Sequence, residues 1–207
     1  MFSVYLAGEL FSYKSLIGNQ LLADKLTSLS EGRYLLKLPQ TLEFPSNRSK
    51  DIRDVDYRAV IECDLTLAQF DGTELDSGTV AEFMLAKSLD IPALLFRSDF
   101  RHSGDQEQGG DAWNLMLSHF PRTESLAINA MALYQASESI DAYLEALADL
   151  LIKKLDSLLV HKPVIAMTQE QATQHFSDSI KRANLSSIIS DTELIDIVQI
   201  KRSKGLL

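Results

Sequence analysis

Cysteine is nearly absent from this sequence of 207 residues, which contains a single one, Cys63. One cysteine cannot form an intrachain disulfide or build a cysteine metal cluster. Cys63 lies in an apolar run, which favours a small residue of the core over a reactive thiol. The four histidines, His102, His119, His161 and His175, show no metal-ligand spacing. We therefore expect no metal site and no cofactor.

A surplus of basic residues is also missing, because 29 Asp and Glu outnumber 20 Lys and Arg and the net charge is -9. This balance argues against a groove for a nucleic acid polymer and against binding to an anionic membrane surface. No apolar stretch reaches the length that spans a membrane. Residues 1–11 lack a basic leader and are better explained by a buried first strand. We expect a cytoplasmic protein.

Short apolar runs alternate with helical patterns through residue 160. The expected strands cover residues 2–7, 34–38, 65–70, 93–96 and 127–134, and the expected helices cover 13–29, the second half of 47–62, 78–89 and 141–159. This alternation predicts an α/β fold: a doubly wound, flavodoxin-like parallel sheet of five strands flanked by helices. We expect a domain over residues 1–160 and a helical C-terminal extension of unknown role over residues 161–207.

Polar residues follow four of the expected strands. They form the segments Gly8-Glu9, Pro39-Gln40, 71–77 and 97–101. Ligands bind beyond the carboxyl ends of the strands in open α/β sheets, so we expect a site at this edge. Residues 98–110 carry three glycines and mixed charge, which predicts a flexible loop or lid.

The segment from Asp71 to Glu82 joins an expected strand to a helix. Asp76 or Ser77 can cap that helix, and Gly78 allows a ligand to approach the backbone closely. Glu82 lies about one turn into the helix, near its apolar side. A carboxylate so placed is a paired structural charge, a solvated group or a catalytic group, and spacing alone does not decide among them.

The pattern D-x-G-x-x-x-E runs from Asp76 to Glu82, and Val4 to Ser12 cover most of the first expected strand and the loop after it. The first resembles the nucleophile motif of the nucleoside 2-deoxyribosyltransferase family, and the second resembles that family's first strand and loop. Asp56 and the following Ile61-Glu62-Cys63-Asp64 resemble the helix and strand start that carry an aspartate on the base side. Trp113-Asn114-Leu115-Met116 resembles a segment that reaches into a neighbouring subunit. The motifs occur in the family's order over residues 2–135.

The resemblance implies three catalytic residues. Glu82 would attack C1′ of the sugar and form a covalent glycosyl-enzyme. Tyr5 would hold Glu82 in position through its hydroxyl, and Asp56 would supply or relay a proton to the leaving base. Taken alone, Tyr5 is better explained as a core aromatic residue and Asp56 as a solvated helix residue.

The resemblance also implies a set of substrate-binding residues. Asp76 would bind polar groups of the substrate, with Gly8 and Gly78 beside it, and Gln40 would contact the base. Asn114 would complete the site of a partner subunit, although alone it could be a helix cap. A homodimer or higher homo-oligomer is therefore expected. Glu9 stands where many family members have proline.

The function predicted in this way is transfer of a 2-deoxyribosyl group between nucleobases. The alternative is hydrolysis of a nucleoside or a nucleoside 5′-monophosphate by the same nucleophile, with water as the acceptor. A non-catalytic nucleotide-binding domain is the third possibility. The carboxylate of Asp76 would repel a 5′-phosphate, which favours an unphosphorylated nucleoside substrate.

Overall fold

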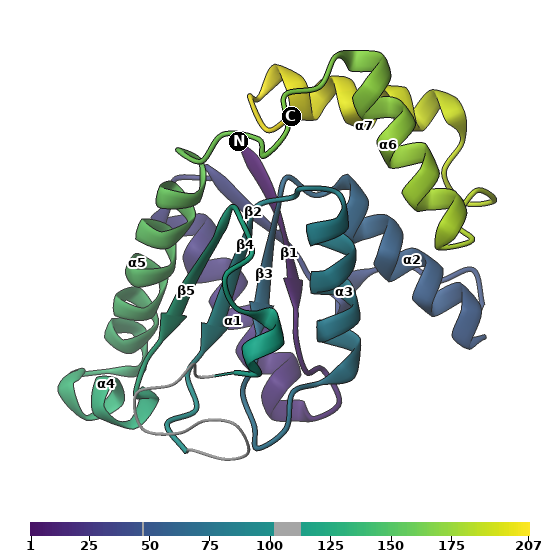
Figure 1. Ribbon diagram of the computed structural model, residues 1–207. Coiled ribbons are helices and arrows are strands. Elements are labelled where there is room, and N and C mark those ends of the chain that lie inside the picture. Colours follow the sequence, from purple (N-terminus) through teal and green to yellow (C-terminus); the bar gives the residue numbers. More distant parts are fainter. Residues whose placement is uncertain (47, 102–112) are drawn as a thin grey trace.

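The computed structural model describes residues 1–46, 48–101 and 113–207. Its centre is a parallel sheet of five strands in the order β2-β1-β3-β4-β5 (Figure 1). The strands are β1 (Phe2–Ala7), β2 (Tyr34–Lys37), β3 (Leu65–Gln69), β4 (Ala93–Arg97) and β5 (Thr123–Ala127). This order confirms the predicted flavodoxin-like α/β fold.

Helices cover both faces of the sheet (Figure 1). They are α1 (Tyr13–Leu29), α2 (Ser49–Glu62), α3 (Ser77–Ser88), α4 (Ala130–Ala136), α5 (Ile140–Leu158), α6 (Gln169–Arg182) and α7 (Asp191–Ser203), with short 3-10 helices η1 (Pro39–Thr41) and η2 (Leu115–Leu117). Helices α1 and α5 pack on one face, and α2, α3, α6 and α7 share a second apolar cluster on the other. None of the helices described is long and apolar enough to cross a membrane.

The side chains of β1 alternate between the two faces of the sheet and so pack against different helices. Val4 and Leu6 belong to the cluster under α1 and α5, whereas Tyr5 and Ala7 belong to the cluster under α2 and α3. Successive side chains of a strand point to opposite faces, which explains this division. The ring of Tyr5 is therefore completely buried beneath α3.

The fifth strand was predicted at residues 127–134, and this prediction is wrong. The strand is Thr123–Ala127, and the residues after it turn into α4. Asn129 caps α4 by accepting a hydrogen bond from the amide of Ala132, and alanine, methionine and leucine then favour the helix. Among the residues that the structure describes, strand β5 pairs only with β4, and it is partly exposed, so it lacks the continuous apolar run of a central strand.

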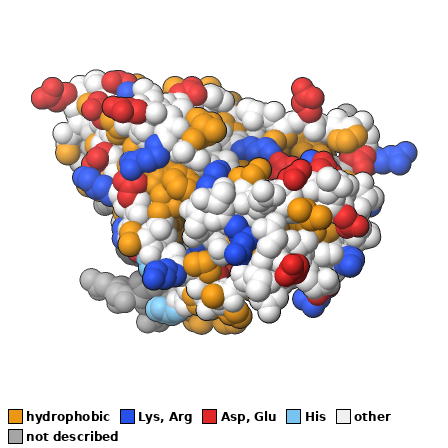
Figure 2. All heavy atoms as spheres, turned by 90° about the horizontal axis from the view of Figure 1, so that it is seen from above, with side chains coloured by type: hydrophobic (Ala, Val, Ile, Leu, Met, Phe, Trp, Pro, Cys, Tyr) orange, Lys and Arg blue, Asp and Glu red, His pale blue; other side chains and the backbone are white. Residues whose placement is uncertain are grey.

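The C-terminal helices lie at the amino ends of the strands, opposite the edge where polar segments follow the strands (Figure 1). Phe176 and Ile180 of α6 and Leu194 and Val198 of α7 join the apolar cluster that contains Tyr5. Polar contacts add to this packing: Lys201 is buried and donates to the carbonyl of Cys63, and Lys204 pairs with Asp64 at 2.6 Å. Seen from this end, acidic, basic and apolar side chains are interspersed (Figure 2).

Candidate active site

A short hydrogen bond joins β1 to α3 at the carboxyl edge of the sheet. The hydroxyl of Tyr5 donates to Oε1 of Glu82 over 2.7 Å. Burial, and then the charge of Glu82, raise the pKa of Tyr5 far above its usual range, so the phenol remains a proton donor. The contact that the family resemblance implies for these two residues is present.

The first turn of α3 places Glu82. Asp76 is the N-cap: its Oδ2 accepts hydrogen bonds from the amide of Thr79 over 2.7 Å and from the hydroxyl of Thr79 over 2.9 Å. Of the two predicted caps, Asp76 is therefore the one used. A Cβ at Gly78 would lie 3.1 Å from the same Oδ2, which explains why a glycine suits this position. The cap fixes the residue at which α3 begins and therefore the position of Glu82 along the helix axis.

Asp56 adds a second carboxyl from α2. Its Oδ1 is shielded from solvent and finds no hydrogen-bond partner among the described residues. Burial raises the pKa of Asp56 to about 6. Burial also raises the pKa of Glu82 to about 7; the hydrogen bond from Tyr5 opposes this rise, and the charges of Asp56 and Asp76 reinforce it.

These three side chains form one cluster with a defined chemical capacity. Glu82 has one oxygen held by Tyr5, which leaves Oε2 for a reacting atom. Because Glu82 and Asp56 both bind protons near neutral pH, one can be a carboxylate while the other is a carboxylic acid. One nucleophilic carboxylate beside one carboxylic acid is the set that cleavage of a glycosidic bond with retention of configuration requires.

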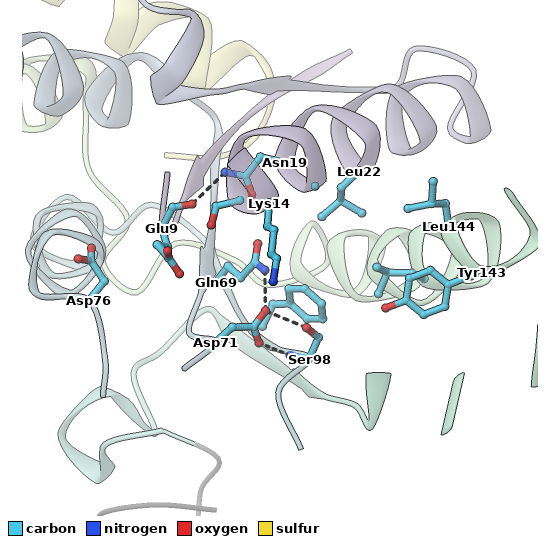
Figure 3. Close-up of a pocket in the computed structure, with 14 residues that line it drawn as sticks. Glu9, Lys14, Asn19, Leu22, Gln69, Asp71, Asp76, Ser98, Tyr143 and Leu144 are labelled. Atoms are coloured by element: carbon cyan, nitrogen blue, oxygen red, sulfur yellow. Dashed lines mark hydrogen bonds between the residues drawn. The ribbon is translucent and has the colours of Figure 1, made fainter. Parts of the chain in front are cut away.

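A cavity of about 280 Å³ lies next to this cluster, at the carboxyl ends of β1, β3 and β4 (Figure 3). Its polar wall includes Glu9, Gln69, Asp71, Asp76 and Ser98, and its apolar wall comes from α1, α5 and the end of β4, with Leu22, Phe96, Tyr143, Leu144 and Leu147. Glu82, Tyr5 and Asp56 do not line it. Asp76 is the residue that belongs to both the cavity wall and the surroundings of Glu82.

Asp71 connects two segments at the rim of this cavity through hydrogen bonds. It accepts hydrogen bonds from Gln69 Nε2 at 2.7 Å, from the Ser98 amide at 2.6 Å and from the Asp99 amide at 2.8 Å. The end of β3 is thus tied to the loop after β4. Gly8 stands close to this rim, because a Cβ there would lie 3.3 Å from Cβ of Gln69.

Two of the residues predicted to bind substrate form hydrogen bonds with other parts of the protein. Gln40 donates to the carbonyl of Leu16 over 2.8 Å and accepts from Asn19 at 3.4 Å, so it ties the turn after β2 to α1. Asn114 caps η2 by accepting from the amide of Met116 over 2.9 Å. Of the loop expected at residues 98–110, residues 102–110 lie outside the described part of the chain.

The sequence interpretation did not identify the cavity residues Lys14, Gln69 and Tyr143, and it included Ser98 only as part of the polar segment 97–101. Gln69 carried a usable signal, since it is a polar residue at the end of an apolar strand, and Ser98 directly follows β4. Lys14 and Tyr143 lie on α1 and α5, and only the packing of these helices brings them to the cavity.

Comparison with known proteins gives a family match. An α/β chain with a tyrosine-held carboxylate at the carboxyl edge of its sheet fits an enzyme of glycosidic bonds. Residues 4–116, more than half of the sequence, match the family model of nucleoside 2-deoxyribosyltransferase, and the chain belongs to this family of N-glycosyl transferases and hydrolases. A comparison with curated proteins gives no match.

Three solved structures illustrate the similarity. A conserved protein from Enterococcus faecalis V583 shares 22% identity with a TM-score of 0.49, over 76% of this chain and 98% of its own. A 2-desoxiribosyltransferase from Leishmania mexicana shares 19% identity with a TM-score of 0.48, over 72% and 98%. A CMP N-glycosidase from Clostridium botulinum shares 18% identity with a TM-score of 0.44, over 72% and 98%.

Proposed function

We propose that this protein transfers a 2-deoxyribosyl group from one nucleobase to another through a covalent glycosyl-enzyme on Glu82. The observation that carries this proposal is the hydrogen bond from Tyr5 to Glu82, with the partly buried Asp56 close by, in a chain of this family. The substrates are a deoxynucleoside and a free nucleobase.

In the first step, Oε2 of Glu82 attacks C1′ while the bond between C1′ and the base nitrogen breaks. The bonding electron pair leaves with the base, and Asp56 supplies the proton that makes the base a neutral leaving group. In the second step, the nitrogen of the acceptor base attacks C1′, the ester to Glu82 breaks, and the proton of the acceptor returns to Asp56. Two displacements at one carbon retain its configuration.

Burial and hydrogen bonding suit these two roles. Burial raises the pKa values of Glu82 and Asp56 toward neutrality, so the pair holds a proton where free carboxyl groups would hold none. The hydrogen bond from Tyr5 lowers the pKa of Glu82 against this rise and so stabilises the ionised form that attacks C1′. Cleavage requires Glu82 in this ionised form and the proton on Asp56.

The surroundings of the site favour a substrate without a 5′-phosphate. Glu9, Asp71 and Asp76 line the adjoining cavity, and Lys14 is the one cationic side chain among its described lining residues. Arg97 is buried, and its guanidinium donates to the carbonyls of Phe70, Gly72, Asp99 and Arg101, so it does not face a ligand. Arg101 pairs with Asp99.

Incubation of the protein with a deoxynucleoside, with and without a second base, tests this proposal. Formation of the new nucleoside supports transfer, whereas release of free sugar at the same rate in both mixtures supports hydrolysis by the same nucleophile. Glu82→Gln should lower turnover by several orders of magnitude, on the scale of losing a covalent nucleophile. The matched control is Glu170→Gln at an exposed position of α6. Absence of both products with the wild-type protein would contradict the proposal.

A further inference from the structure

The segment that contains the C-terminal helices contacts α2 at one residue before Asp56 in the sequence and at one residue after it. Arg53, three residues before it, donates to the carbonyl of Ala183 at the end of α6. Arg58, two residues after it, donates to the carbonyl of Ile188 in the turn between α6 and α7. Figure 1 shows this turn beside α2. These contacts bridge 130 positions of the sequence, so they bind two separate segments together.

Arg58 belongs to a continuous chain of charged contacts. Its Nε donates to Glu62 over 2.6 Å, and a terminal nitrogen donates to Glu193 over 2.8 Å. Glu62 in turn accepts from Lys37 of β2 at 2.7 Å. Glu193 accepts from the amide and hydroxyl of Ser190 at 2.8 and 2.7 Å, which completes the capping box of α7. The chain runs from β2 through α2 to the first turn of α7.

Helix α2 has an apolar side that complements these contacts. Ala59, Val60 and Ile61 are completely or almost completely buried in the cluster that also contains Phe176 and Leu194. The helix is therefore held between the sheet and the C-terminal helices. Asp56 lies close enough to Tyr5 of β1 and Glu82 of α3 for its charge to raise the pKa of both. The distance of Asp56 from Glu82 depends on where α2 packs.

We propose that Arg58 is a positioning residue, which holds Asp56 in place for proton transfer by anchoring α2 to the turn between α6 and α7. This inference rests on the proposed function of Asp56 as the acid that protonates the leaving base. It gives the C-terminal helices a role in catalysis although they lie at the opposite end of the strands from the site (Figure 1).

The main test compares leaving groups. Arg58→Met should lower kcat about ten- to a hundredfold for a deoxynucleoside whose base needs a proton to leave, because small displacements of a catalytic group cost that much. For a deoxynucleoside of an acidic base, which leaves readily as an anion, the loss should be under about threefold, because little general acid catalysis is required. Equal losses for both substrates would mean general damage to the fold and would overturn the proposal.

Two further variants act as controls. Arg33→Met removes a guanidinium of similar exposure that pairs with Asp156 of α5 at 3.0 Å, on the other face of the sheet, and it should leave kcat for both substrates unchanged. Arg58→Lys keeps a cation near Glu193 but lacks the three guanidinium nitrogens that contact Glu62, Ile188 and Glu193. Its kcat should therefore lie between those of Arg58→Met and the wild type. If Arg33→Met also lowers kcat more for the base that needs a proton to leave than for the acidic base, the effect is not specific to Arg58 and the proposal is contradicted.

A measurement without substrate separates this inference from the proposed function. The pKa of Asp56, which burial raises to about 6, can be followed by NMR titration of its carboxyl carbon. Hydrogen bonds from Ser190 and then Arg58 lower the pKa of Glu193 to about 2, so that carboxylate stays ionised throughout this titration. In Arg58→Met the pKa of Asp56 should fall toward its ordinary value as α2 loosens and water enters.

The outcomes of the two measurements are distinct. An unchanged pKa of Asp56 in Arg58→Met would overturn the positioning role even if the wild-type enzyme is active. A lowered pKa together with no turnover by the wild-type protein would support the anchoring of α2 and contradict the proposed function alone.

Discussion

The hydroxyl of Tyr5, on the central strand β1, donates a 2.7 Å hydrogen bond to Oε1 of Glu82, on the second turn of α3. This contact joins the most buried layer of the fold to its candidate nucleophile. It orients the carboxylate through Oε1 and lowers its pKa, which favours the ionised form. Each consequence can be measured separately.

Removal of the Tyr5 hydroxyl should slow the reaction moderately. Tyr5→Phe deletes one orienting hydrogen bond with a net worth of about 1 kcal/mol, or about fivefold in rate. Because that bond lowers the pKa of Glu82, its loss should raise this pKa and move the acid limb of the kcat/KM profile to higher pH. A pH profile of the variant checks the shift. A loss as large as that of Glu82→Gln would show that Tyr5 has another role.

Stability should depend on pH through Glu82. Its pKa rises from an ordinary 4.5 to about 7 on folding, so the folded state binds the proton more tightly and loses stability as pH rises from about 4.5 to 7. Glu82→Gln keeps a neutral hydrogen-bond acceptor for Tyr5 and should be more stable than wild type at pH 8 by about 3 kcal/mol, with little difference at pH 4. Denaturant unfolding at both pH values measures this. Equal stability at pH 8 would contradict the burial of this charge.

A deoxynucleoside should be a better substrate than its 5′-monophosphate. The phosphate would approach Glu9 and Asp76, and like charges in a partly desolvated site cost several kcal/mol, about a thousandfold in kcat/KM. Asp76→Asn weakens this repulsion, so it should reduce the ratio of kcat/KM for the deoxynucleoside to kcat/KM for the monophosphate, provided that the amide oxygen still caps α3. A higher kcat/KM for the monophosphate in the wild-type enzyme would place the phosphate away from Asp76 and favour the hydrolase alternative.

Asn114 should act in the site of a partner subunit. Leu115 and Met116 beside it are exposed apolar residues, as a segment that contacts a neighbour requires. Glu82→Gln and Asn114→Ala should each be impaired alone, and a mixture of the two should regain activity, because some sites in a mixed oligomer combine an intact Glu82 with an intact Asn114. No recovery on mixing, after subunit exchange is verified by light scattering and mass analysis, would assign Asn114 to its own subunit.

The sequence predicted the central strands for physical reasons, whereas it predicted the contact of Tyr5 with Glu82 only through the family resemblance. Strands β1, β3 and β4 are apolar runs covered on both faces, and Asp76 lies at a helix start where a cap is expected. The edge strand β5 gave a weaker pattern, since only part of it is buried. Features that depend on tertiary packing could not be predicted in this way: Lys14 and Tyr143 reach one cavity from separate helices, and Arg58 meets Glu193 across 135 positions.

The covalent intermediate gives the most direct test of the account. The enzyme is mixed with a deoxynucleoside in the absence of an acceptor base, quenched with acid during turnover, digested and weighed by mass spectrometry. The account predicts one added deoxyribosyl unit on the peptide that contains Glu82, and loss of the adduct when an acceptor base is supplied before the quench. Full turnover without any adduct on this peptide, together with an active Glu82→Gln variant, would contradict it.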